Sequence, residues 1–82
     1  MQAWRVSWTF AAKTALRAIP WRDAARVDAA VLSFAAGKGG DVVGRLAHDP
    51  RTPWLRVRGY LIRLRLDPKA RTILVLYVWR SA

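Results

Sequence analysis

The sequence predicts an α+β fold in which a helical hairpin packs on one face of a small, mainly antiparallel sheet. Arginine and aliphatic residues alternate in WLRVR at residues 54–58 and in YLIRLRL at residues 60–66. A period of two is typical of strands with one buried face. Two segments with apolar residues at helical spacing precede them, and another alternating segment lies near the N-terminus. The expected order is β-α-α-β-β-β in a single domain over residues 1–82.

The N-terminal element is expected to be a half-buried strand over residues 4–10, because large apolar and small polar residues alternate there. The large residues are Trp4, Val6, Trp8 and Phe10. Thr9 can then cap a helix that runs through residue 18. Its apolar positions recur at spacings of four and three, at Ala12, Leu16 and Ile19. Pro20 ends this helix or begins the next one.

A second helix is expected over residues 21–36, where alanine is frequent. Its apolar stripe consists of Ala24, Val27, Val31 and Phe34. The run GKGG at residues 37–40 lacks the spacing of a phosphate-binding loop and reads as a helix stop. Residues 41–53 are treated as a loop with one anchored apolar contact, because Gly44, Pro50 and Pro53 break longer elements. A short helical turn at Val42, Val43 and Leu46 is the alternative.

Three strands follow, over residues 54–58, 60–67 and 72–79, with turns at residues 58–59 and 67–70. The last strand is apolar on both sides, which predicts a central position in the sheet. Leu55 and Val57 should face the helices. The opposite face should then carry four arginines with aromatic residues among them: Arg56, Arg58, Arg63 and Arg65, with Trp54, Tyr77 and Trp79.

Charge favours an anionic partner. The 82 residues include 15 Lys and Arg against 5 acidic residues, so the formal net charge is +10. Arginine and aromatic side chains on an open sheet suit single-stranded nucleic acid, because guanidinium groups bind phosphates and rings stack on bases. The alternative is a solvated charged face that keeps a small basic protein soluble. Exposed tryptophans make the binding interpretation the stronger one.

The usual catalytic groups are scarce. His48 is the single histidine and lies beside Asp49 in the expected loop, where a solvated side chain is the simpler interpretation. Cysteine is absent from the sequence, and no metal-ligand cluster or paired carboxylates stand out. We therefore expect no metal and no cofactor. Neither a signal peptide nor a bilayer-spanning segment is evident, so a cytoplasmic location is expected.

The element order and three stretches of sequence resemble the RelE/ParE superfamily of bacterial type II toxins. The stretches are WRVSWT at residues 4–9, the positions Ala12, Leu16 and Ile19 followed by Pro20, and LRVRGYLIRLRLDPKARTILVLYVWR at residues 55–80. The last is the most specific, and it is similar to a family pattern of LRVG, YR, a hydrophobic strand, an acidic turn and VLRVGHR. The resemblance covers nearly the whole chain. It implies a cytoplasmic toxin that is neutralised by an acidic antitoxin encoded beside it.

Within this resemblance, Arg56 and Arg58 match basic positions of the second strand, and Arg80 lies at or beside the basic position that ends the fourth. Departures from the pattern bear on cleavage more than on fold. Leu61 stands where the family has arginine, and basic residues follow it as Arg63 and Arg65. Tyr77 and Trp79 replace the more common arginine and glycine, and the sequence ends at Ala82 without the basic, tyrosine-bearing tail of ribosome-dependent nucleases.

The two branches of the superfamily imply different targets. Members of the RelE branch cut mRNA on the ribosome without a metal, and members of the ParE branch poison DNA gyrase. The leading hypothesis is a metal-independent endoribonuclease whose catalytic candidates are Arg56, Arg63, Arg65, Arg80 and Tyr77. Nucleic acid would be bound by Arg58, Trp54 and Trp79. The alternatives are a gyrase inhibitor without nuclease activity and a degenerate member that only binds antitoxin.

Overall fold

The computed structural model describes residues 3–43 and 51–81. In this part the chain forms two helices and five strands. The N-terminal half contains β1 (Arg5–Trp8), α1 (Phe10–Arg17), α2 (Trp21–Ala35) and β2 (Asp41–Val43). The C-terminal half contains β3 (Trp54–Val57), β4 (Tyr60–Asp67) and β5 (Thr72–Arg80). The α+β class is therefore confirmed.

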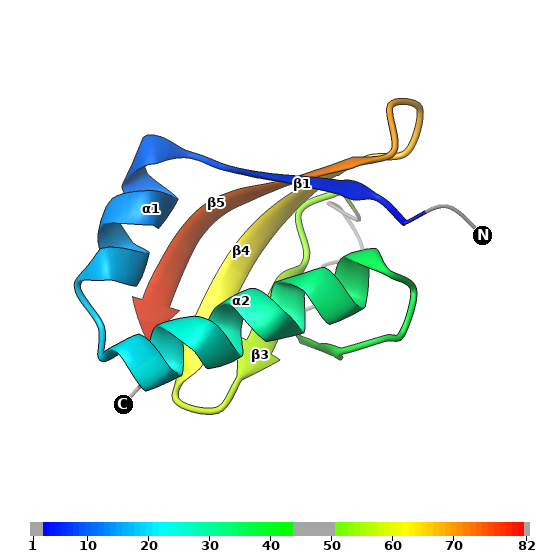
Figure 1. Cartoon of the computed structure of the whole chain (residues 1–82). Helices are drawn as coiled ribbons and strands as arrows, with labels where there is room; N and C mark the ends of the chain where they lie inside the picture. Colours follow the sequence, from blue (N-terminus) through cyan, green and yellow to red (C-terminus); the bar gives the residue numbers. More distant parts are fainter. Residues whose placement is uncertain (1–2, 44–50, 82) are drawn as a thin grey trace.

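The strands form one sheet in the order β1-β5-β4-β3-β2. β1 pairs with β5 in parallel, and the other neighbours are antiparallel. β5 is the last of the described strands in the sequence, but it lies inside the sheet, between β1 and β4 (Figure 1). The apolar residues on both of its sides predicted this position. The longest ladder joins β4 to β5, and the Arg58-Gly59 turn joins β3 to β4 with φ of +83° at Gly59.

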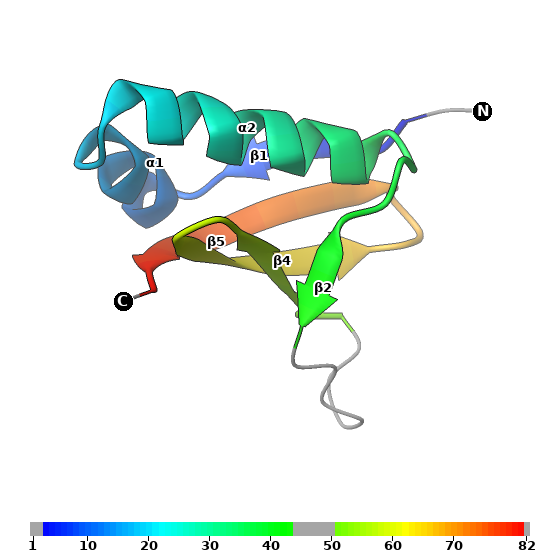
Figure 2. The same cartoon turned by 90° about the horizontal axis from the view of Figure 1, so that it is seen from below.

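Both helices lie on the same side of the sheet, as the view from below in Figure 2 shows. Thr9 caps α1 as predicted, because its Oγ1 accepts a hydrogen bond from the Ala12 N–H at 3.0 Å. The same hydroxyl donates to the Leu76 carbonyl oxygen of β5 at 2.8 Å. One threonine therefore fixes both the start of the helix and its place against the central strand.

The core lies between the helices and the inner side of the sheet. The predicted helix stripes are confirmed, with Val27 and Val31 of α2 fully buried and Ala12 of α1 beside them. The sheet contributes Leu55, Val57, Tyr60, Ile62, Leu64, Ile73, Val75 and Val78. Neither of the two described helices lies on the opposite side of the central strands (Figure 2). We call this side the open face, formed by Trp54, Arg56, Leu61, Arg63, Arg65, Leu74, Tyr77 and Trp79.

Two expectations from the sequence were wrong. Residues 41–43 were expected to begin a loop, but they form β2, which pairs with β3 through Val42 opposite Leu55. Phe10 was expected on the buried side of the first strand, but it begins α1 and is 84% exposed. The alternating pattern continues through Phe10, while the Thr9 cap has already turned the chain into a helix. His48 and Asp49 lie outside the described residues.

Candidate nucleic-acid interface

A β-bulge in the ladder between β4 and β5 places the aromatic residues of β5 on the open face. Arg63 is opposite Tyr77, whereas the next residue, Leu64, is opposite Val75, so Leu76 is an extra residue on β5. An extra residue reverses the alternation of sides along a strand. Residues 73, 75, 77 and 79 are two positions apart and would share one side of a regular strand. Because of the bulge, Ile73 and Val75 face the core, whereas Tyr77 and Trp79 face outward.

The aromatic side chains form a cluster above β4. The ring centroids of Trp54 and Trp79 are 4.9 Å apart, and those of Tyr77 and Trp79 are 4.5 Å apart. Trp54 comes from β3 and Trp79 from β5, so the cluster bridges the two strands that flank β4. Both pairs are tilted, at 49° and 60°, which is a favourable arrangement for aromatic rings. Trp79 is 45% exposed to solvent, so its ring offers a surface on which a base could stack.

The arginines of the open face have different surroundings. Arg56 forms an ion pair with Asp41 of β2, with 2.8 Å between Nε and Oδ2. The guanidinium of Arg63 lies 4.8 Å from the centroid of the Trp54 ring and donates to Thr52 Oγ1 at 3.0 Å. Arg65 is exposed, and no ion pair or hydrogen bond of its side chain occurs among residues 3–43 and 51–81. Of the three, Arg65 is the most accessible to a phosphate.

Two of the predicted site residues lie elsewhere. Arg58 occupies the β3–β4 turn, and Arg80 shares the helix-covered side of the sheet with its partner Tyr60. They line a polar hollow of about 470 Å³ at this end of the sheet. We call this hollow the end pocket, and it is lined by Asp23, Arg26, Arg58, Gly59, Tyr60, Arg80 and Ser81. The predicted set of basic residues thus divides between the open face and the end pocket.

Tyr60 and Asp23 are central to the end pocket. The Tyr60 side chain is buried, and its hydroxyl donates to Asp23 Oδ2 at 2.6 Å. This hydrogen bond raises the pKa of the Tyr60 phenol above its ordinary value, and burial adds to the effect. A tyrosine phenol is already protonated at neutral pH, and the raised pKa of Tyr60 extends its protonated range further into alkaline pH. Tyr60 is therefore suited to donating a hydrogen bond rather than to removing a proton.

Sequence reasoning missed Asp23 and Arg26 as members of a site. Asp23 lies one helical turn before the buried Val27, so it belongs to the side of α2 that faces the sheet. An acidic residue on a core-facing stripe requires a polar partner. That position was the available signal, and the partner, Tyr60, lies 37 residues further along the chain.

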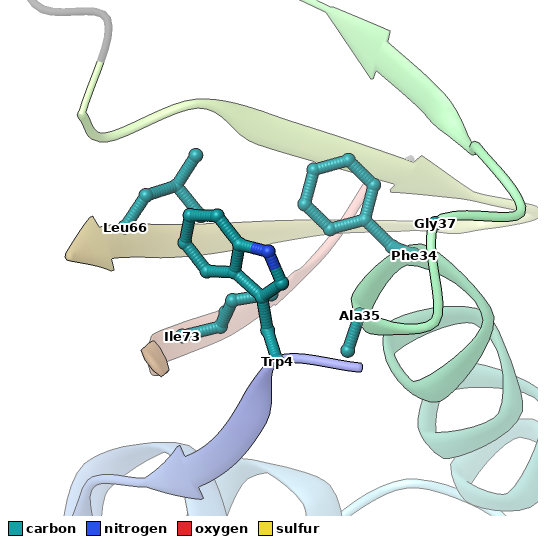
Figure 3. A pocket seen from close by; sticks show the side chains of 6 residues that line it. All are labelled: Trp4, Phe34, Ala35, Gly37, Leu66 and Ile73. Carbon is teal, nitrogen blue, oxygen red and sulfur yellow. The ribbon is translucent and has the colours of Figure 1, made fainter. Parts of the chain in front are cut away.

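An apolar hollow lies at the other end of the sheet. Its volume is about 220 Å³, and it is lined by Trp4, Phe34, Ala35, Gly37, Leu66 and Ile73. Figure 3 shows the indole ring of Trp4 among the side chains of Leu66, Ile73 and Phe34. The backbone N–H of Trp4, not its indole, donates to the Ala35 carbonyl oxygen at 2.9 Å, which ties the start of β1 to the end of α2. A nearby surface hollow carries three cations, Arg5, Lys69 and Arg71.

Within residues 3–43 and 51–81, no group of three His, Cys, Asp or Glu side chains could hold a metal ion. None of the described helices combines the length and the apolar character needed to cross a bilayer. The chemistry available in the described sites is therefore that of guanidinium groups, phenols, indole rings and the carboxylates of Asp23 and Asp41.

Comparison with known proteins bears on the fold. No family model and no curated protein matches the sequence. Among solved structures, a chain of the toxin–antitoxin complex RelBE2 from Mycobacterium tuberculosis matches with a TM-score of 0.72. The match covers 98% of this chain and 100% of that chain, at 22% sequence identity. The α+β fold expected from the resemblance is confirmed, and this chain shares that fold with a chain of the RelBE2 toxin–antitoxin complex.

Proposed function

We propose that this protein is the toxin of a type II toxin–antitoxin pair, that it acts in the cytoplasm, and that its open face binds RNA. The observation that carries the proposal is the aromatic cluster of Trp54, Tyr77 and Trp79 beside Arg63 on a RelE-like fold. Stacking rings and guanidinium groups on adjoining strands match the alternating bases and phosphates of a single strand.

RNA cleavage on this face would depend on electrostatics and positioning. Arg65 is exposed and free to approach a phosphate, and Arg63 is held in a fixed place by Trp54 and Thr52. Tyr77 lies directly opposite Arg63 and is the phenol on the open face that could transfer a proton. These three side chains form the catalytic group that we propose for a metal-independent endoribonuclease.

A second candidate is a gyrase inhibitor without nuclease activity, as in the ParE branch. The observation that favours it is the engagement of two arginines within the protein itself. Arg56 is paired with Asp41, and Arg63 is stacked on Trp54 and bonded to Thr52. A group that stabilises a developing charge must be available to the reacting phosphate. Internal partners reduce that availability, whereas they do not prevent binding to a protein target.

The proposed partner is an acidic antitoxin. With a formal net charge of +10, a body of 82 residues attracts acidic proteins strongly. The outer side of the helical hairpin also exposes Phe10, Trp21 and Leu32, at 84%, 74% and 52%. Exposed large apolar side chains beside cations suit an amphipathic acidic segment. We propose that the antitoxin covers the helical hairpin or the open face.

Expression of the chain in bacteria tests the proposal. We expect growth to slow, and co-expression of the acidic protein encoded alongside to restore it. New mRNA 5′ ends inside codons would identify an mRNA interferase, and gyrase-linked DNA breaks would identify the second candidate. Arg65→Gln should weaken the effect on growth, whereas Arg22→Gln, which removes the same charge from α2, should leave it unchanged. Normal growth at full soluble expression would contradict toxicity.

A further inference from the structure

The end pocket combines cations that are brought together by the fold rather than by sequence. Arg26 comes from α2, Arg58 from the β3–β4 turn and Arg80 from the end of β5. The Ser81 N–H donates to the Gly59 carbonyl oxygen at 2.9 Å and holds the end of β5 against the turn. The backbones that carry Arg58 and Arg80 are therefore fixed beside each other.

The carboxylate of the end pocket is already engaged. Asp23 Oδ2 accepts from the Tyr60 hydroxyl at 2.6 Å, and Oδ1 accepts from Arg26 Nη1 at 3.2 Å. Asp23 therefore offsets the charge of Arg26. Arg58 and Arg80 are both exposed, and neither has a carboxylate partner among residues 3–43 and 51–81. Among the described residues that line the end pocket, Arg58 and Arg80 therefore carry two positive charges that no carboxylate offsets.

We propose that the end pocket binds the terminal phosphate of an RNA strand that lies on the open face. This inference rests on the proposed function, because it extends the RNA site. A phosphate monoester carries about −1.5 to −2 charges at neutral pH, and a carboxylate carries only one. Two free guanidinium groups in one hollow therefore match a phosphate monoester better than an acidic side chain.

The open face and the end pocket adjoin at the end of the sheet, because neighbouring residues of β5 belong to each. Trp79 and Arg80 are consecutive residues of β5 and point to opposite sides of the sheet. Their partners on β4 are the consecutive residues Leu61 and Tyr60. A base stacked on Trp79 is thus the last base before the edge beyond which the pocket opens. A strand that ends there places its terminal phosphate toward Arg58 and Arg80.

The test compares short RNAs of one sequence that carry a 5′-phosphate, a 3′-phosphate or hydroxyl groups at both ends. Affinity is measured by fluorescence anisotropy with an internal label. We expect one phosphorylated form to bind about tenfold more tightly than the hydroxyl form, the effect of one charge-assisted hydrogen bond. The 5′ and 3′ forms show which end enters the pocket. The preference should disappear in a variant that carries both Arg58→Gln and Arg80→Gln.

A matched control is available at the opposite end of the sheet. A variant with Arg5→Gln and Arg71→Gln removes the same charge from the separate hollow that those residues line. This variant should retain the tenfold preference for the phosphorylated RNA. Equal loss in both variants would mean that net charge alone causes the preference, and this result would overturn the proposed site.

Failure of the inference and failure of the proposed function give different results. Equal affinity for phosphate and hydroxyl ends, with both affinities lowered by Trp79→Ala, would overturn the phosphate site and leave the open face as an RNA site. If no RNA binds, titration with inorganic phosphate judges the pocket alone, and unshifted amide resonances at Gly59 and Ser81 would overturn it. The inference is also overturned if an acidic peptide shifts these resonances and phosphate does not.

Discussion

The hydrogen bond between Tyr60 and Asp23 joins the side chain of an α2 residue to the inner side of the sheet. Its oxygen–oxygen distance is 2.6 Å, and the Tyr60 side chain is buried at 3% exposure. Because Asp23 also accepts from Arg26, the carboxylate joins a phenol from β4 to a guanidinium from its own helix. The contact between α2 and β4 therefore depends on the charge of Asp23 and on the proton of Tyr60. The stability of the fold should accordingly depend on the ionisation of Tyr60.

The first prediction concerns alkaline pH. The pKa of Tyr60 is raised above 10.0 in the folded protein, chiefly by the hydrogen bond to Asp23, whereas the unfolded chain ionises near the ordinary value. The folded state therefore holds this proton more tightly. The stabilisation is complete below about pH 10 and is lost as pH rises through the raised pKa. Urea unfolding from pH ~8 to ~11 should show a steeper loss in the native protein than in Tyr60→Phe. Parallel curves would contradict it.

The second prediction concerns Asp41, which would compete with RNA for Arg56 if the open face binds RNA as proposed. Asp41→Asn should release the guanidinium, because Nε lies 2.8 Å from the Asp41 carboxylate. RNA affinity should then increase by several-fold, since exposed ion pairs are worth about 1 kcal/mol or less and charge is also added. Asp28→Asn makes the same change in net charge on the exposed side of α2. An equal gain in the two variants would show that Arg56 has no special part in binding.

At the scale of elements, Thr9 connects β1, α1 and β5. Its Oγ1 caps α1 at Ala12 and donates to Leu76, and its N–H donates to the Val75 carbonyl oxygen at 3.0 Å. The bonds to β5 are made at Val75 and Leu76, where the bulge lies. Hydrogen bonds of Thr9 thus stabilise both the start of α1 and the bulge at which the side chains of β5 change sides.

The third prediction follows from this position. Thr9→Ala should lower the free energy of unfolding by about 1–2 kcal/mol, because the cap is lost and the Leu76 carbonyl loses a donor. Thr9→Ser should retain most of the stability. Thr14→Ala, in the exposed part of α1, should change it by less than about 0.5 kcal/mol. Urea denaturation followed by circular dichroism measures all three variants, and similar values for Thr9→Ala and Thr14→Ala would contradict the prediction.

The sequence predicts well those helices and strands whose apolar pattern repeats over enough residues to show its period. β4 was predicted with its observed bounds, Tyr60–Asp67, and α2 within one residue, because their patterns extend over two or more turns or pleats. β2 was missed because its three residues are too few to show a period. Its pairing with β3 joins segments that are separated in the sequence, so no local pattern indicates it. The aromatic face was predicted, but the bulge at Leu76 that produces it is set by pairing between strands.

The candidate site was predictable only in part, for the same reason. Trp54, Arg63, Arg65, Tyr77 and Trp79 follow from alternation along single strands. The ion pair of Arg56 with Asp41 depends on β2, and the meeting of Arg58 and Arg80 with Asp23 depends on the position of α2 over the sheet. Such contacts join residues that are far apart in the sequence. A single sequence shows which side chains are available, and only the packed structure shows which of them are already engaged.

At the scale of the whole molecule, cations are spread over both ends of the sheet and the open face. The fourth prediction uses salt to separate them. If the protein contacts about four phosphates of a single RNA strand, the logarithm of the affinity should fall with the logarithm of the salt concentration at a slope of roughly −3. Arg65→Gln should make the slope shallower by about 0.7, whereas Trp79→Ala should weaken binding by about 1–3 kcal/mol with nearly the same slope.

Arg22→Gln is the control for this measurement, because it removes one positive charge from α2, on the helix-covered side of the sheet. The guanidinium of Arg22 lies 5.2 Å from the Trp21 ring on the surface of that helix. Its affinity and slope should equal those of the native protein. If Arg22→Gln reduces them and Arg65→Gln does not, RNA binds to the helical hairpin and the open face is the wrong interface.

The central position of β5 has a consequence for the order in which the protein can be completed. Arg5 pairs with Thr72 and Trp8 with Val75, so β1, the first of the described strands to leave the ribosome, has as its partner β5, the last of them. Until residues 72–80 have emerged, β1 has no neighbour and β4 has an open edge. Long-range parallel pairing of this kind is slow to form. The nascent chain can therefore pair β2, β3 and β4 first, but it completes the sheet, and with it the aromatic cluster, only after residues 72–80 have emerged, when the proposed acidic partner could already be present.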